Sequence, residues 1–223
     1  MAQAIASILP FAVGIMVSPI PIVAVILMLF TKRATVNGPA FLVGWVVGLS
    51  LLATIGYLAA SALGWGDGSS ESATEVQWWR VGLGVVLLVL AFRKWRKIRE
   101  PEHVEEMPAW MAGIEEIAPL KAFGLAAVLS SVNPKNLVLG LGAMTSLATL
   151  GAPTEQAVVG MIAFVVIASL SVAAAVLYRL LGGAKAETSL QTAQAWLKMH
   201  NDAVMAVLLL VFGVVLVAKG LGG

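Results

Sequence analysis

Cysteine is absent from this chain of 223 residues, and charged residues make up only 12% of it. The lack of cysteine excludes disulfides, thiolate metal ligands and thiol chemistry. Soluble globular domains are about 45–50% apolar and about 25% charged, whereas this chain is 60% hydrophobic. A soluble core of this length could not hide so many apolar side chains. The composition therefore predicts a polytopic membrane protein of the all-α class.

Long uncharged runs locate the predicted membrane spans, because a bilayer-spanning helix needs about 20 mostly apolar residues. Breaks at polar, Gly or Pro clusters divide the chain into six predicted helices. The sequence start lacks the basic region of a cleavable signal peptide, so we expect the first stretch to be a retained span. The six helices are expected at about residues 3–30, 39–63, 77–93, 120–150, 156–180 and 203–221.

Basic residues gather in alternate connections between these helices. The connections at 31–38, 93–121 and 179–202 hold Lys32, Arg33, Arg93, Lys94, Arg96, Lys97, Arg99, Lys121, Arg179, Lys185 and Lys198. In the other two connections, at 64–76 and 151–155, the charged residues are all acids: Asp67, Glu71, Glu75 and Glu155. The positive-inside rule makes the basic side cytoplasmic. Six spans then place both termini outside.

Two halves of three helices, with opposite topology, follow from this arrangement. We expect a first repeat over residues 1–93, a cytoplasmic linker over 94–119 and a second repeat over 120–223. Inverted repeats with interrupted helices in equivalent positions are typical of secondary transporters. The first helix of each half carries such an interruption, at Ser18-Pro19-Ile20-Pro21 and at residues 131–136.

Both interruptions contain signals for a new helix start. Ser18 and Asn133 are predicted N-caps, and Pro19 and Pro134 then occupy the first helical position. A helix that begins inside the membrane directs unpaired N–H groups and a positive dipole end into a medium of low dielectric constant. Two such ends, one from each half, would form an anion site.

Lys135 strengthens the prediction of an anion site, because it is the only charged residue between 122 and 154. A lysine in the middle of a bilayer costs about 3 kcal/mol on insertion scales, so an intramembrane lysine is by default a functional hypothesis. The alternatives are a lysine that snorkels to an interface and prolines that only kink their helices. Gly44 and Gly48, at GxxxG spacing, predict close helix packing.

Other kinds of chemistry have little support in the sequence. No Asp, Glu or His lies deep in a predicted span, so we expect no metal site, no acidic proton relay and no cofactor. The serines have no base partner, and the protein is therefore not expected to be an enzyme. The net charge of +2 comes from residues in connections and predicts no nucleic-acid partner.

The two interruptions resemble motifs of the LysE superfamily of bacterial exporters, which have Pro-x-Pro in helix 1 and Asn-Pro-Lys in helix 4. Here these read Pro19-Ile20-Pro21 and Asn133-Pro134-Lys135. The longer forms are most similar to the Gap/Sap branch, whose members are linked to placing glycopeptidolipids and sulfolipids in the cell envelope. The resemblance implies a six-helix transporter in the bacterial cytoplasmic membrane. Ile20 replaces the glycine usual in amino-acid exporters, which argues against a small amino-acid substrate.

We therefore predict export or flipping of an anionic lipid or amphiphile. The alternatives are a small-solute exporter and a non-transporting subunit of an envelope-lipid export machine, and a homodimer is a further possible assembly. The predicted substrate-binding residues are Ser18, Pro19, Pro21, Ser130, Asn133, Pro134, Lys135 and Asn136.

Overall fold

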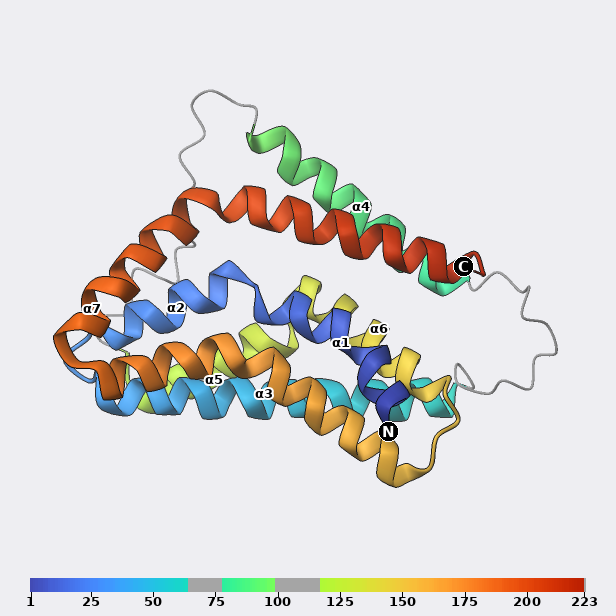
Figure 1. Ribbon diagram of the computed structural model, residues 1–223, viewed down its shortest axis with the longest axis horizontal. Coiled ribbons are helices and arrows are strands. Elements are labelled where there is room, and N and C mark those ends of the chain that lie inside the picture. Colours follow the sequence, from blue (N-terminus) through green and yellow to red (C-terminus); the bar gives the residue numbers. More distant parts are fainter. Residues whose placement is uncertain (64–77, 99–116, 223) are drawn as a thin grey trace.

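The computed structural model describes residues 1–63, 78–98 and 117–222 (Figure 1). The acids of the predicted 64–76 connection and most of the predicted linker lie outside these ranges. The described chain is helical throughout, apart from short turns. Its helices are α1 (Ala2–Met16), α2 (Pro19–Leu29), α3 (Ala34–Ala62), α4 (Trp78–Ile98), α5 (Pro119–Ser131), α6 (Pro134–Ala148) and α7 (Thr154–Gly220).

Three helical segments of the described chain are long and apolar enough to cross a membrane. They are Ala34–Ala62, Thr154–Gly182 and Ala186–Ala218. The pair α1 and α2, bent by 52° at its break, passes the same test as one interrupted span. Length and composition thus support three or four spans among the described residues, and the class is an all-helical membrane protein.

Both predicted interruptions are present. α1 ends at Met16 and α2 begins at Pro19, while α5 ends at Ser131 and α6 begins at Pro134. Each break therefore falls within two residues of its proline, as predicted. A proline has no N–H for the preceding turn, and its fixed φ suits the first position of a new helix. The mid-membrane depth of the two breaks stays a prediction.

The connection predicted at 179–202 is different in the structure, where α7 is helical without interruption from Thr154 to Gly220. The chain contains no proline between these two residues, and residues 186–198 are rich in Ala, Gln and Leu, which favour helix. α7 bends near the end of its first apolar segment, and the second segment then returns along the molecule (Figure 1). α4 likewise continues past the predicted end at residue 93, to Ile98.

Glycines fix the closest helix contacts. A Cβ atom added at Gly44 would overlap the carbonyl group of Phe123, and one added at Gly48 would lie 2.5 Å from the carbonyl oxygen of Ala127. The predicted packing role of these two glycines is therefore confirmed, with α5 as the partner helix. A Cβ added at Gly84 of α4 would lie 2.8 Å from the carbonyl oxygen of Gly213 in α7.

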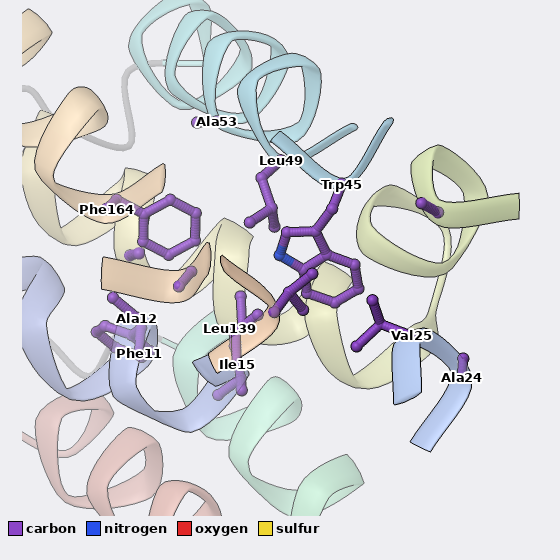
Figure 2. Packing of buried hydrophobic residues seen from close by; sticks show 14 of the residues in the cluster. Phe11, Ala12, Ile15, Ala24, Val25, Trp45, Leu49, Ala53, Leu139 and Phe164 are labelled. Carbon is purple, nitrogen blue, oxygen red and sulfur yellow. The ribbon is translucent and has the colours of Figure 1, made fainter. Parts of the chain in front are cut away.

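The interior is apolar and rich in large side chains. Figure 2 shows Trp45 of α3 in a buried cluster with Leu49 of the same helix, Ile15 of α1 and Leu139 of α6. Phe41 stacks on Trp45 with ring centroids 6.4 Å apart. α1 contacts α6, α2 contacts α5, and α3 contacts both α5 and α6. The two broken helices therefore pack against each other, with α3 beside the second.

Basic residues of the described chain gather toward one end of the molecule. The α2–α3 turn, the end of α4, the start of α5 and the bend of α7 lie toward one end of the long axis (Figure 1). Both chain termini lie toward the other end, where the terminal amino group of Met1 donates a hydrogen bond to Gln156 Oε1 at 2.9 Å. The bend end carries basic residues of the described chain, including Lys32, Arg33 and Lys121.

Candidate functional site

The break between α1 and α2 leaves carbonyl groups at the end of α1 without their ordinary helical partners. The carbonyl of Ile15 would normally pair with the N–H of residue 19, which is a proline, and it accepts the N–H of Ser18 at 3.0 Å instead. The carbonyl of Met16 accepts a hydrogen bond from the Ser171 hydroxyl of α7 at 2.6 Å. This first break is therefore closed partly by a side chain of another helix.

Ser18 occupies the predicted N-cap position of α2 and is buried, as are Pro19 and Pro21. Its hydroxyl makes no capping hydrogen bond within the described chain. The prediction of position is thus confirmed, whereas the expected side-chain cap is wrong. Pro21 occupies the third position of α2, so one of the two N–H groups that an N-cap side chain usually serves is missing.

The break between α5 and α6 contains a complete N-cap. The Asn133 side-chain oxygen accepts a hydrogen bond from the backbone N–H of Lys135 at 3.0 Å, and Pro134 takes the first helical position. Both predictions for this helix start are confirmed. The start of α6 is therefore fixed by its own local sequence.

Asn136 spans the same break from the other direction. Its side-chain amide donates to the carbonyl oxygens of Leu129 at 3.1 Å and of Ser130 at 3.3 Å, both near the end of α5. The Asn136 side-chain oxygen is buried and has no partner among the residues that the structure describes. The donors of Asn136 hold the two half-helices together, and its free group is an acceptor.

Ser130 has a packing role. Its hydroxyl donates to the Ala127 carbonyl at 3.0 Å, and the residue is fully buried against Gly48 of α3. Ser130 therefore helps to set the distance between α3 and α5 at the level of the break.

Lys135 is the charged group of the site. Only 4% of its surface is exposed, and its Nζ has no hydrogen-bond partner in the described part of the chain. An ammonium group in an apolar interior is costly unless it is paired. Lys135 therefore does not snorkel to a surface, and the unpartnered cation is next to the N-terminus of α6, which adds positive potential.

The second break thus gathers Ser130, Asn133, Pro134, Lys135 and Asn136 in one place, whereas Ser18, Pro19 and Pro21 belong to the first. The contacts of α1 with α6 and of α2 with α5 link the two breaks. That the two helix starts together form an anion site stays a prediction.

Two residues of the region were not predicted. Ser171 is one of many small residues in its apolar run, and its contact with Met16 follows from tertiary packing. Trp45 lies in α3, which contains no charged residue, and an aromatic residue in such a helix indicates only core. Its indole Nε1 is buried and unpartnered among the described residues.

Long apolar segments around interrupted helices define this chain as an α-helical membrane protein. The chain belongs to the family described as Sap, sulfolipid-1-addressing protein, whose family model matches residues 8–222. The match confirms the resemblance to the Gap/Sap branch. No curated protein and no solved structure matches the chain.

Proposed function

We propose that this protein exports or flips an anionic cell-envelope lipid, or a similar amphiphile, across the bacterial cytoplasmic membrane. The observation that carries the proposal is the buried, unpartnered side-chain nitrogen of Lys135 at the broken helix. A cation in that setting gains most from a bound anion, because a nearby opposite charge interacts strongly where water is scarce. The family description, which refers to a sulfolipid, supports a lipid with an anionic headgroup.

An inverted repeat is the proposed architecture. Exchanging the halves converts α1 into α5, α2 into α6, and α3 into the first segment of α7. Each of three contacts then has its counterpart in the other half. The contact of α1 with α6 corresponds to that of α5 with α2, and the contact of α3 with α5 corresponds to that of α7 with α1. The contact of α3 with α6 corresponds to that of α7 with α2. Such reciprocity supports two similar three-helix halves, which in transporters rock about a central site.

The proposed orientation places the bend end of the molecule in the cytoplasm and both termini outside. The basic residues at this end support the assignment through the positive-inside rule. Arg179 also donates from Nε to the carbonyl of Leu29 at 3.3 Å and lies 3.6 Å from Glu187, so the first segment of α7 is tied to the end of α2 there.

A small-solute exporter would use the same cation. The two kinds of transporter would differ in whether the substrate has a lipid tail. A non-transporting subunit of a lipid export machine is the second candidate, because the family description refers to addressing rather than transport. We favour a transporter because an accessory subunit has no need of an unpaired buried lysine between two half-helices.

The test is lipid flipping by the purified protein alone in liposomes. The probe is a fluorescent lipid with a sulfated sugar headgroup, and its neutral, unsulfated analogue is the comparison. We expect the protein to speed the exchange of the sulfated probe between leaflets. Lys135→Met keeps most of the aliphatic stem but removes the charge, and it should slow this exchange at least tenfold, since one lost pairing with a buried charge is worth about 1.5–3 kcal/mol. Lys135→Arg keeps a permanent cation and should retain binding with slower turnover.

Lys121→Met is the matched control, because Lys121 is exposed in the first turn of α5, and it should flip lipid at the wild-type rate. Normal lipid flipping by Lys135→Met would contradict the proposed anion site. Flipping of neither probe by the wild-type protein would favour the accessory subunit.

A further inference from the structure

Trp45 lies about two turns before Leu52, where α3 meets Gly140 of α6. It is 1% exposed and belongs to the same buried cluster as Leu49 and Leu139 (Figure 2). The cluster also contains Ile15 from the end of α1 and Val25 from α2. Trp45 is therefore surrounded by residues of both broken helices.

The register of α3 against the second broken helix relates the level of Trp45 to that of Lys135. Gly48 meets Ala127 and Ser130, while Leu52 lies against Gly140, so α3 runs in the same direction as α5 and α6. The break at residues 132–133 falls between these two levels. Trp45 precedes Leu49 by four residues, and Lys135 precedes Leu139 by four, so each lies one turn closer to its helix start on the same face. Helical side chains lean toward the N-terminus, and because α3 and α6 run in the same direction this lean is the same for Trp45 and Lys135.

Trp45 and Lys135 share an unusual state of their polar atoms. The indole Nε1 and the lysine Nζ are both buried and both lack a partner among the described residues. Both groups are donors only. A buried tryptophan N–H usually finds an acceptor, and leaving it unpaired costs about 1–3 kcal/mol. The described chain pairs neither donor, although Asn136 beside Lys135 has a free side-chain oxygen, and one bound oxyanion would satisfy both donors.

We infer that the Trp45 indole N–H donates a hydrogen bond to the anionic headgroup that Lys135 binds. The headgroup is then an oxyanion with at least two accessible oxygens, such as a sulfate ester, a phosphate ester or a carboxylate. One oxygen accepts from the indole and another pairs with the ammonium. The inference rests on the proposed function and adds the chemical class of the headgroup and the residue that selects it. A neutral hydroxyl headgroup would satisfy the indole but leave the ammonium unpaired.

The experiment uses the purified full-length protein in neutral detergent, titrated with decyl sulfate, decyl phosphate and decanoate below micellar concentrations. Decyl maltoside is the neutral probe. Indole N–H signals in a ¹H–¹⁵N spectrum report on the seven tryptophans, and the signal lost in Trp45→Phe identifies Trp45. We expect this signal to move downfield with the oxyanions and to stay in place with decyl maltoside. A tryptophan that only packs would not show this difference.

A second variant removes the N–H while keeping the shape of the side chain. Replacing the indole of Trp45 by benzothiophene substitutes sulfur for the N–H group and should weaken oxyanion binding about tenfold or more, the loss expected for one hydrogen bond to a charged group. The same replacement at Trp196, which is exposed and stacks on His200, should leave the affinity unchanged.

Two results would overturn the inference: an unchanged Trp45 signal at saturation, or normal affinity in the benzothiophene variant. If Lys135→Met loses binding while the benzothiophene variant keeps it, the proposed anion site survives and the role of Trp45 does not. If the wild-type protein binds none of the three oxyanions, both proposals fail.

Discussion

The side-chain amide of Asn136 donates a hydrogen bond to the carbonyl oxygen of Ser130, which is the carbonyl that Pro134 leaves without its helical partner. The same amide also reaches the carbonyl of Leu129. One side chain thus replaces the backbone donors that the break removes. An unsatisfied carbonyl in an apolar interior is costly, because no water is present to pair with it. The break can therefore be kept open in the membrane without loss of the fold.

Asn136→Leu should destabilise the protein. The variant keeps a similar side-chain volume but leaves two buried carbonyls without a donor, and a loss of about 1–3 kcal/mol in unfolding free energy is expected. Thermal unfolding in detergent measures the effect. Gln194→Leu is the control, because the Gln194 side-chain nitrogen is buried and donates to no described residue. Equal stability of the two variants would contradict a bridging role for Asn136.

Local chemistry accounts for what could be predicted from the sequence. The breaks at Pro19 and Pro134 depend on residues next to them, and Gly44 and Gly48 predict close packing by their spacing alone. Lys135 was predicted as the charge of the site because nothing else in its run is ionisable.

Tertiary contacts account for what could not be predicted. The hydrogen bond from Ser171 to Met16 joins residues 155 positions apart, and the isolation of the Trp45 indole depends on neighbours from several helices. The continuity of α7 was missed because Arg179 and the polar residues after it suggested a loop, whereas the absence of proline allowed the helix to continue.

Gly44→Ala should disrupt the contact between α3 and α5. The new methyl group would meet the backbone carbonyl of Phe123, which cannot move as a flexible side chain can. Overpacking of this kind costs about 1–3 kcal/mol. Gly124→Ala provides a matched control on the facing helix, because a Cβ there meets nothing within 4 Å, and alanine favours helix by up to about 1 kcal/mol over glycine. Thermal unfolding should rank Gly124→Ala at or above the wild type and Gly44→Ala below it. The opposite order would refute a close α3–α5 contact at Gly44.

Lys94 and Asp202 form an ion pair that connects α4 to the second segment of α7. Their side chains are 31% and 11% exposed, so the pair is screened less than a surface pair but more than a buried one. A double-mutant cycle with Lys94→Met and Asp202→Asn should give a coupling of about 1–3 kcal/mol in unfolding free energy, between the values for exposed and buried pairs. The Arg179–Glu187 pair is longer, at 3.6 Å, and Glu187 is 45% exposed, so its cycle should give under about 1 kcal/mol. A coupling near zero for Lys94 and Asp202 would show that α4 is held to α7 by apolar packing alone.

The proposed membrane orientation can be tested directly, because the natural chain has no cysteine to confuse a labelling experiment. Glu155 is exposed near the start of α7, at the end of the molecule that holds both termini, and Lys121 is exposed near the start of α5, at the bend end. If the basic end is cytoplasmic, Glu155→Cys should react with a membrane-impermeant thiol reagent in intact cells, whereas Lys121→Cys should react only after the cells are permeabilised. Removal of a single charge at either site should leave the orientation unchanged, since the other basic residues of the bend end remain. The reverse labelling pattern would place the bend end outside.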